Sequence, residues 1–357
     1  MYTQIIKITD INGQTKDLQK AGDIIKGGGL VAFPTETVYG LGASGFDEGA
    51  TTEIYRVKGR PSDNPLILHV AEFDMVASVA EVTPLAQKLL TAFCPGPLTL
   101  VMKRKSTVPD CITGGLKTVG VRWPDNEIAQ AFIKAAGVPI AAPSANLSGR
   151  PSPTTAEAVR RDLEGRIPLI LDGGSCRFGL ESTIVDCTEA TAVILRPGAV
   201  TREMIAEVVG EVRLDPGLVG KKNVPKAPGM KYTHYAPKAP LTLVEASPEK
   251  MKGIFRRELR RLQKETKVIG VIVSDELANF LQESELVPPD LIVSYGQREN
   301  LTAIAANLYA SLRYFDDKAV EQLLAEGTAD TGLGLAIMNR LRKAAGFRVI
   351  KVDGQIF

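Results

Sequence analysis

The sequence is poor in the residues that build metal centres and covalent active sites. Its 357 residues include four cysteines and two histidines, and no two cysteines form a CxxC pair. This spacing does not predict a zinc site. Isolated cysteines are typical of small buried residues or free thiols in a reducing cytosol. A cysteine nucleophile would need a histidine beside it in space, so that chemistry is not favoured.

Long apolar runs and a strong net charge are also absent. No apolar segment reaches the roughly 18 residues that a membrane-spanning helix needs, and residues 1–4 do not begin a basic region followed by an apolar run. We therefore expect no secretory signal, no membrane and a cytoplasmic location. The formal net charge is +2, from 43 basic and 41 acidic residues. That balance does not predict avid nonspecific binding to nucleic acid.

Three familiar motifs are missing or incomplete. The sequence has no GxxxxGK[ST] P-loop. One GxGxxG match covers 40–45, but the region about 20 positions later, where a dinucleotide fold needs an acidic residue, is bracketed by Pro61 and Pro65. No nucleophile elbow accompanies His69 or His234. Neither a dinucleotide site nor a Ser/His/Asp triad is therefore favoured.

The region before residue 213 alternates helices and strands, as α/β proteins do. Apolar residues at helical spacing predict a helix over 16–26, and an apolar run predicts a strand over 30–33. Late in the region strands outnumber helices, at 169–171, 182–187 and 193–195. We therefore expect residues 1–212 to form one domain with a mixed sheet, not a purely parallel one.

Residues 213–240 have the composition of a linker, because prolines and glycines crowd together with little apolar periodicity. Two tyrosines and the second histidine lie within 227–237, so we expect this part to be ordered and to dock. Beyond the linker, strands are predicted near 241–245, 268–273, 291–294 and 347–352, and helices near 248–264, 275–283, 300–313 and 334–345. Residues 241–357 should form a small, mainly parallel, doubly wound domain.

The stretch from Phe33 to His69 concentrates polar side chains between two apolar strands. It is interpreted as a loop of small and hydroxyl residues, a helix over 47–56 and a basic turn. Further hydroxyl, amide and cationic residues lie at strand ends or in Gly/Pro-rich turns elsewhere. The whole set is Thr35, Thr37, Lys58, Arg60, Asn64, His69, Thr118, Arg122, Ser144, Asn146, Ser148, Ser152, Ser182, Thr183 and Arg196. Loops beyond strand ends collect into one crevice, and these groups suit phosphate oxygens and a small zwitterion.

Each of these residues also has a plain structural interpretation when it is taken alone. A single serine or threonine is more often a helix cap or a turn residue. His69, alone at a strand end, is more often a structural histidine. The cations at 103–105, Arg160 and Arg161 are most simply solvated surface, and they are left out of the candidate site.

Eight motifs together resemble one known family. They are FPTETVYGLGAS, KGRPSDNPL, CPGPLTLV, VGVRWP, PIAAPSANLSGRPSPT, ESTIVD, ILRPG and APGMKYTHYAP. In this order they resemble the YrdC-like family and, more closely, its longer two-domain branch, the threonylcarbamoyl-AMP synthases. The resemblance covers nearly the whole chain. It implies a YrdC-like twisted mixed sheet with flanking helices, followed by a smaller Rossmann-like α/β domain.

The resemblance implies a nucleotidyltransferase that converts L-threonine, bicarbonate and ATP into threonylcarbamoyl-AMP, pyrophosphate and water. This is the first step of a tRNA adenosine modification, so the implied partners include downstream tRNA threonylcarbamoyl-transfer proteins and a weak contact with tRNA. Mg would arrive on ATP, without a protein cage or an organic cofactor. Because a carbamate decomposes readily in water, residues 227–237 are expected to close over the site as a lid.

The resemblance also assigns roles to residues of the candidate set. The implied L-threonine pocket consists of Thr37, His69, Arg122, the Ala142 backbone and Ser182. The implied ATP site consists of Arg60, Asn64, Thr118, Ser144, Ser152, Arg196 and Tyr232. Neighbouring catalytic or supporting groups would be Thr35, Lys58 and Asn146.

Three other interpretations stay open from the sequence. A noncatalytic double-stranded RNA or tRNA-binding module would use a basic concave face, although aromatic and basic residues do not interleave on the predicted strands. Carbamoyl transfer from another donor is a second, although the accessory domains of such proteins have no counterpart here. The 241–357 domain could instead be a nucleotide-binding regulator, but it has no phosphate motif, and we favour a scaffold that anchors the lid.

Overall fold

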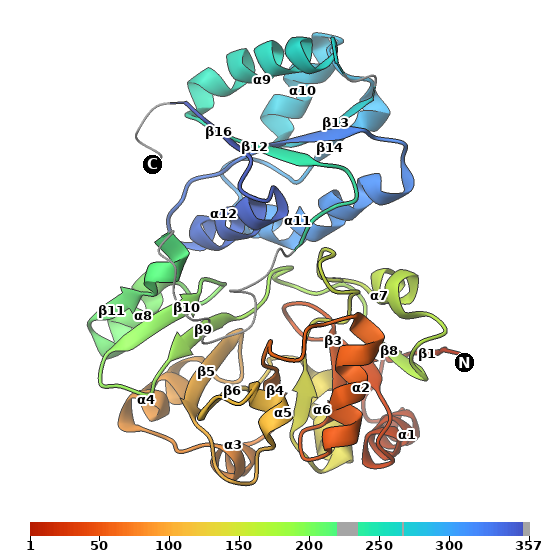
Figure 1. The fold of residues 1–357 in the computed structure, drawn as a ribbon, viewed down its shortest axis with the longest axis vertical. Helices are drawn as coiled ribbons and strands as arrows, with labels where there is room; N and C mark the ends of the chain where they lie inside the picture. The colour runs from red at the N-terminus through yellow and green to blue at the C-terminus, as the bar shows by residue number, and fades with distance from the viewer. Residues whose placement is uncertain (220–234, 266–267, 353–357) are drawn as a thin grey trace. The chain divides into compact units, whose positions relative to one another are not determined.

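The computed structural model describes residues 1–219, 235–265 and 268–352. The chain divides into two compact units (Figure 1). The first unit comprises Met1–Ser148 and Ser152–Tyr232, and the second comprises Gly149–Pro151 and Thr233–Phe357. In the described ranges, no helix combines the length and the apolar character that crossing a membrane would require.

The first unit alternates short strands with helices. Its elements are β1 (Gln4–Lys7), α1 (Thr15–Lys26), β2 (Val31–Phe33), β3 (Gly40–Ser44), α2 (Glu48–Lys58), β4 (Ile67–His69), α3 (Phe73–Val79), α4 (Pro84–Phe93), β5 (Leu98–Lys103), α5 (Asp110–Thr113), β6 (Thr118–Arg122), α6 (Glu127–Ala136), β7 (Ile140–Ala142), α7 (Ala156–Leu163), β8 (Leu169–Asp172), β9 (Thr183–Asp186), β10 (Ala192–Arg196), α8 (Arg202–Val209), β11 (Val212–Leu214) and the 3-10 turn η1 (Pro216–Val219). Part of the expected linker, residues 220–234, lies outside the described residues.

An 11-stranded sheet runs through the first unit in the order β1-β8-β2-β3-β7-β4-β6-β5-β9-β10-β11. Its pairings are of both kinds: β4 pairs with β6 in parallel, whereas β5 pairs with β6 antiparallel. The expectation of a mixed sheet is therefore confirmed. Because so many non-consecutive strands are neighbours, residues far apart in sequence meet on this sheet.

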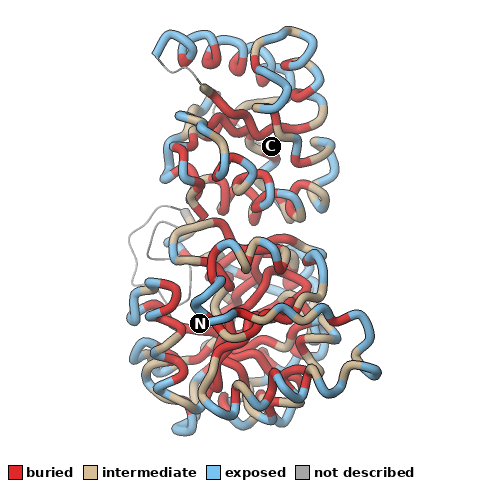
Figure 2. The backbone as a smooth tube through the Cα atoms, turned by 90° about the vertical axis from the view of Figure 1, so that its right-hand side faces the viewer, coloured by how far each residue is buried: buried red, intermediate tan, exposed pale blue. Residues whose placement is uncertain are grey.

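Strand alternation gives the sheet two distinct faces. In β6, Val119 and Val121 enter a large core that also receives α2, α4, α7 and α8. A second core, which includes Val31 and Phe33 of β2, is closed by α1 and α6. Figure 2 shows the buried strands running through the interior of each unit, with exposed residues on the outer helices and loops.

Helix α2 has clear start and stop signals that place two candidate residues. Asp47 caps its first turn, where the Asp47 carboxylate accepts a hydrogen bond from Ala50 N at 2.9 Å. It ends at Gly59, whose φ of 61° is the left-handed conformation that glycine adopts without strain. Lys58 is therefore the last residue of the helix, and Arg60 begins the following turn.

The GxGxxG match is a strand rather than a loop. The small and hydroxyl residues after Pro34 are expected from the sequence to form a loop, but Gly40–Ser44 forms β3, antiparallel to β2. A Cβ on Gly40 would lie 2.9 Å from Phe33 Cε1, and one on Gly42 would lie 2.7 Å from Ile140 Cγ2. These glycines allow neighbouring side chains to approach the strand closely, so the match has a packing role.

The second unit is a smaller α/β fold. Its elements are β12 (Leu241–Glu245), α9 (Pro248–Leu262), β13 (Ile269–Val273), α10 (Asp275–Glu283), η2 (Pro289–Leu291), β14 (Ile292–Ser294), α11 (Leu301–Tyr314), η3 (Phe315–Asp317), β15 (Gln322–Glu326), α12 (Leu333–Ala344) and β16 (Val349–Lys351). The sheet order is β14-β13-β15-β12-β16, and the neighbouring strands pair in parallel. This confirms the expected doubly wound domain.

Strand β15, at the centre of this sheet, was missed by the sequence analysis. Its residues Leu323, Leu324 and Ala325 form a continuous apolar run without alternation. All three are 0% exposed, because β15 lies between β12 and β13 and is covered on both faces. A short run of this kind cannot be distinguished from part of a buried helix by periodicity.

Candidate active site

A row of polar side chains crosses neighbouring strands of the first unit. His69 of β4 lies beside Arg122 of β6, and Arg122 lies opposite Thr99 of β5. Thr99 Oγ1 is 2.7 Å from Ser182 Oγ, and Arg196 Nη2 of β10 donates to Ser182 Oγ at 3.2 Å. All five residues are buried. Strand pairing thus brings together candidate residues that are far apart in the sequence.

Sheet geometry places this row on a single face. Successive side chains of β6 point to opposite faces, so Val119 and Val121 pack into the large core while Arg122 faces away from it. The same alternation in β5 sends Leu98 and Leu100 to that core and Thr99 to the opposite face. Four of the five residues of the polar row thus lie in strands, and Ser182 immediately precedes β9.

The loop between β2 and β3 brings an acidic residue to this row. Glu36 Oε2 lies 2.8 Å from Arg122 Nη2, and both side chains are buried. Arg122 Nη2 also donates to Thr35 Oγ1 at 3.4 Å, and Thr35 Oγ1 is 2.9 Å from Thr37 Oγ1. Among the described residues, Arg122 Nε has no hydrogen-bond partner. A buried guanidinium nitrogen of this kind is suited to a ligand carboxylate.

His69 is held neutral in this setting. Burial, and then the positive charge of Arg122, lowers the pKa of His69 to about 3. His69 Nδ1 is 3.2 Å from Ile67 O, a contact that the tautomer with its proton on Nδ1 makes as a hydrogen bond. The ring also meets Phe33 edge to face, with 5.8 Å between centroids. A neutral imidazole adds no second cation beside Arg122.

A second cluster is centred on Lys58. Lys58 Nζ donates to Ser144 O at 2.6 Å, to Asn146 Oδ1 at 3.4 Å and to Asn146 O. Ser144 Oγ donates to Asn146 Oδ1 at 2.5 Å. Lys58 is 3% exposed, so its ammonium is committed to shaping the turn that follows β7. This turn is where the sequence places PSANLSG.

The two clusters are joined through the segment that follows the Glu36 loop. Ala145 N donates to Tyr39 O at 2.8 Å, and Gly40 forms an isolated antiparallel bridge with Ser144. Thr35 and Thr37 lie at the start of this segment, and Ser144 pairs with Gly40 at its end. The structure therefore brings the residues expected around threonine and part of the set expected around ATP into one continuous region.

The other predicted residues divide between this region and its edges. Arg60 donates to Asn64 O at 3.3 Å and to Pro65 O at 3.0 Å, which fixes the turn before β4. Thr118 lines a small hollow together with Thr99, Pro65 and other residues. Ala142 pairs with Ile67 in the sheet. Tyr232, like most of the predicted lid at 227–237, lies outside the described residues.

Three residues of this region were missed by the sequence analysis. Glu36 pairs with Arg122, Thr99 contacts Ser182, and Glu181 Oε1 accepts a hydrogen bond from Ser152 Oγ at 2.6 Å. Each lies within or next to a motif that had been singled out, namely FPTET, CPGPLTLV and ESTIVD. The sequence signal that could have identified these three residues was therefore their position inside a polar motif.

Cysteine chemistry and a protein metal cage find no support in the described residues. Burial raises the pKa of Cys94, Cys176 and Cys187 to about 12, so these thiols stay protonated near neutral pH. Within the same described ranges, no group of three or more His, Cys, Asp or Glu side chains could hold a metal ion. The region instead offers hydroxyls, main-chain groups and cations.

Fold and site together define a two-unit α/β protein whose first unit buries a row of cationic and hydroxyl side chains on one face of its sheet. Residues 23–198 match the family model described as "Telomere recombination", and residues 200–346 match "Threonylcarbamoyl-AMP synthase, C-terminal domain". The chain belongs to the threonylcarbamoyl-AMP synthase family.

Two full-length relatives carry that family name. The threonylcarbamoyl-AMP synthase of Pyrococcus abyssi is 47% identical over 334 residues, which cover 93% of this chain and 95% of the relative. The threonylcarbamoyl-AMP synthase of Bacillus subtilis is 45% identical, with 97% of this chain and 98% of the relative covered. The resemblance inferred from the motifs is thus confirmed along the whole chain.

A solved structure agrees with the fold. The crystal structure of P. abyssi Sua5 complexed with L-threonine is 44% identical to this chain, with a TM-score of 0.91, and the match covers 99% of this chain and 100% of that one. The inferred combination of a twisted mixed sheet and a second, parallel α/β domain is confirmed by this similarity and by the two sheets described above.

Proposed function

We propose that this chain catalyses the condensation of L-threonine, bicarbonate and ATP to threonylcarbamoyl-AMP, pyrophosphate and water, as a nucleotidyltransferase. The observation that carries the proposal is the buried polar row around Arg122, in a chain whose full-length relatives are named threonylcarbamoyl-AMP synthase. Burying a guanidinium is costly unless it is paired, and Arg122 is paired here with the buried Glu36.

Arg122 would bind the carboxylate of threonine. A guanidinium can form two parallel hydrogen bonds to a carboxylate, and Nε is a buried Arg122 nitrogen that has no hydrogen-bond partner among the described residues. Glu36 occupies Nη2, so threonine binding would require Glu36 to share or give up this contact. Thr37, His69, Ser182 and the Ala142 backbone would surround the rest of the amino acid, as the family resemblance implies.

The nucleotide would bind beside the turn that Lys58 organises. Ser144, at that turn, and Ser152 would contact it, with Arg60, Asn64, Thr118 and Arg196 around the phosphates and base, as the resemblance implies. Because Lys58 donates to Ser144 O and Asn146 O, we assign it to positioning this turn rather than to direct neutralisation of phosphate charge. The nucleotide enters as MgATP, with Mg²⁺ as part of the substrate.

The chemistry requires positioning and charge stabilisation. The threonine amine loses a proton and forms a new bond to the carbon of bicarbonate, and water leaves to give a carbamate. A carbamate oxygen then attacks the α-phosphorus, and the bond to the pyrophosphate leaving group breaks. Residues that hold the two substrates in line lower this barrier without covalent participation of the protein.

The product suits a separate second reaction. Threonylcarbamoyl-AMP is a mixed anhydride, so a downstream tRNA threonylcarbamoyl-transfer system would take its acyl group to an adenosine of tRNA. We assign the chemistry to residues 1–212 and a supporting role to residues 241–357. We divide the roles in this way because all described members of the polar region belong to the first unit.

Pyrophosphate release tests the proposal directly. The full-length protein should release pyrophosphate from MgATP when L-threonine and bicarbonate are both present, and omission of either should reduce release to background. Pyrophosphate release that is independent of threonine would contradict the proposal. Salt-sensitive RNA binding without such release would instead favour the RNA-binding module.

A further inference from the structure

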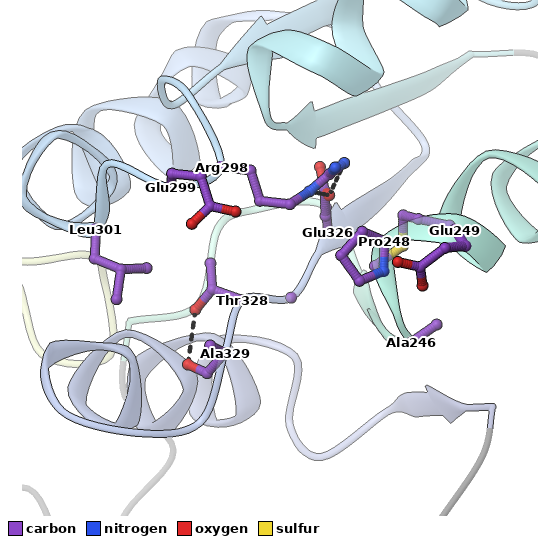
Figure 3. Close-up of a pocket in the computed structure, with 11 residues that line it drawn as sticks. Ala246, Pro248, Glu249, Arg298, Glu299, Leu301, Glu326, Thr328 and Ala329 are labelled. Atoms are coloured by element: carbon purple, nitrogen blue, oxygen red, sulfur yellow. Dashed lines mark hydrogen bonds and ion pairs between the residues drawn. The ribbon is translucent and has the colours of Figure 1, made fainter. Parts of the chain in front are cut away.

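A cavity of about 400 Å³ lies in the second unit, at the carboxyl ends of its strands (Figure 3). Ala246 follows β12, Glu326 and Gly327 are at the end of β15, Arg298 comes from the segment between β14 and α11, and Leu301 is the first residue of α11. The volume falls within the range of about 300–1,000 Å³ that is typical of small-molecule sites. None of these residues belongs to the polar region of the first unit.

The topology of the second sheet predicts a ligand at this position. The chain leaves β12 through α9 toward β13 on one side, and it leaves β15 through α12 toward β16 on the other side. Because such connections are right-handed, α9 and α10 cover one face and α11 and α12 cover the other (Figure 1). Neighbouring strands β12 and β15 therefore flank a switch point, where open α/β sheets bind ligands outside the strand ends.

A buried ion pair fixes a cation in the wall of this cavity. Glu326 is 1% exposed, and its Oε1 accepts from Arg298 Nε at 3.0 Å and from Nη2 at 2.8 Å. Ser274 N donates to Glu326 Oε2 at 2.7 Å, and Tyr295 OH donates to Glu326 O at 2.8 Å. With Nε and Nη2 held in this way, Nη1 is the guanidinium nitrogen that can meet a ligand carboxylate.

The charges of the wall argue against a nucleotide. Three carboxylates, from Glu249, Glu299 and Glu326, line the cavity together with the guanidinium of Arg298. The turn from β12 into α9, residues 246–248, contains no glycine and places a proline at the first helical position. This turn lacks the glycine-rich backbone that cradles phosphates, whereas Gly327, which also lines the cavity, lies in the loop from β15 into α12. The three carboxylates of the wall are therefore what disfavours a nucleotide.

Two of these carboxylates remain available to a cation. Glu326 is neutralised by Arg298, whereas Glu249 and Glu299 are exposed and lie on opposite sides of that pair (Figure 3). An ammonium group is the ligand chemistry that fits such carboxylates. Ala246, Met251 and Leu301 add apolar surface. The wall therefore has one cationic contact, two anionic contacts and an apolar portion.

We propose that this cavity binds a small zwitterionic α-amino acid. Its carboxylate meets Arg298, its ammonium meets Glu249 or Glu299, and its side chain lies against Met251 and Leu301. The inference concerns the second unit alone and does not depend on the reaction proposed for the first. It is also distinct from the threonine subsite around Arg122.

Methyl NMR of the full-length protein tests this site directly. The protein is labelled at methionine and leucine methyl groups, and the twenty L-amino acids are added one at a time. At least one should shift the Met251 ε-methyl and a Leu301 δ-methyl signal saturably. These two reporters line the cavity, so binding of threonine at the first unit alone would leave them unchanged.

Matched variants separate the proposed contacts from general charge effects. Glu249→Gln/Glu299→Gln should weaken binding of that amino acid at least tenfold, whereas Glu265→Gln/Glu283→Gln removes two exposed carboxylates elsewhere in the unit and should change binding less than twofold. Leu301→Trp, which fills the cavity, should abolish the Met251 shift. Unchanged methyl signals elsewhere show that each variant is folded.

Four results would overturn the proposal. The first is that no amino acid shifts the reporter methyl groups, and the second is that putrescine, which has ammonium groups but no carboxylate, shifts them as much as the amino acid does. The third is that AMP or inorganic phosphate shifts them. The fourth is that both double variants weaken amino acid binding equally. An active enzyme without amino acid binding at the reporters would refute this site alone, whereas an inactive enzyme with such binding would refute the proposed reaction alone.

Discussion

Glu36 Oε2 lies 2.8 Å from Arg122 Nη2, and the two side chains are buried together beneath the loop between β2 and β3. Each charge needs the other, because a buried charge without a partner costs several kcal/mol. Glu36 thus occupies part of the guanidinium that we assign to the carboxylate of threonine. Under the proposed role of Arg122, the pair links the stability of the fold to substrate binding.

Replacing Glu36 with glutamine should affect stability and binding in opposite directions. Glu36→Gln leaves Arg122 without its buried partner, so the free energy of unfolding should fall by about 3 kcal/mol. Threonine should then bind more tightly, since its carboxylate no longer competes with a protein carboxylate. Thermal unfolding with and without threonine measures both effects.

An exposed ion pair provides the control for this substitution. Glu53 pairs with Arg56 on the surface of α2, and Glu53→Gln should change stability by less than about 1 kcal/mol. It should also leave the threonine-induced rise in Tm unchanged. If threonine raises the Tm of Glu36→Gln no more than that of the wild type, the competition between the two carboxylates is refuted.

Arg122→Lys should impair threonine binding far more than ATP binding. Lysine keeps the charge but loses the planar fork, and it cannot make the paired hydrogen bonds that Nε and Nη2 can offer a carboxylate. We expect the threonine KM to rise at least tenfold, which corresponds to about 1.4 kcal/mol, with the ATP KM within twofold of wild type. Arg166→Lys, at an exposed position, is the control. Equal losses for both substrates would show that Arg122 does not have this role.

Lys58→Met should disturb the nucleotide rather than the amino acid. It removes the ammonium that Ser144 O and Asn146 O accept from, and a buried carbonyl left without a donor costs about 1–3 kcal/mol. The turn after β7 should lose its geometry, so calorimetry should record at least tenfold weaker ATP binding and little change for threonine. Lys88→Met removes an exposed lysine and should leave both affinities unchanged.

The sequence predicted most of the fold because its local signals agree with the tertiary structure. Helix α2 shows this: Asp47 caps its start and Gly59 ends it, as the chain itself suggests. β15 was missed because its three buried residues do not alternate, and its central place in the sheet depends on distant strands. β3 was missed because glycines usually weaken strands, whereas here they accommodate Phe33.

The candidate site was predictable in part for the same reason. Arg122 and Ser182 belong to polar motifs at strand ends, and the motif resemblance supplied their expected roles. Thr99 could not be assigned, because its hydroxyl reaches Ser182 only through the pairing of β5 with β9. The Glu36–Arg122 contact likewise depends on a loop that reaches over the sheet, which no local pattern encodes.

His69 should make the stability of the protein depend on pH in a mildly acidic range. Its pKa falls from the ordinary 6.5 to about 3 in the folded chain, so between these pH values the unfolded state binds a proton that the folded state does not. The stabilising contribution is therefore complete above pH 6.5 and is lost as pH falls toward 3. From pH 7 to pH 5 the wild type should lose about 2 kcal/mol through this group, at about 1.4 kcal/mol for each pH unit below the unfolded pKa.

The variant His69→Gln isolates this contribution, because glutamine does not titrate. Urea unfolding at pH 7 and pH 5 should give the wild type a larger loss of stability than His69→Gln, since the carboxylates common to both proteins contribute equally to each. Amide and imidazole differ in packing, so the comparison is the change with pH within each protein rather than the absolute stability. An equal pH dependence in both proteins would mean that His69 is already cationic in the folded protein at pH 5. That result would contradict the effect of burial and of the Arg122 charge, which lower the pKa of His69.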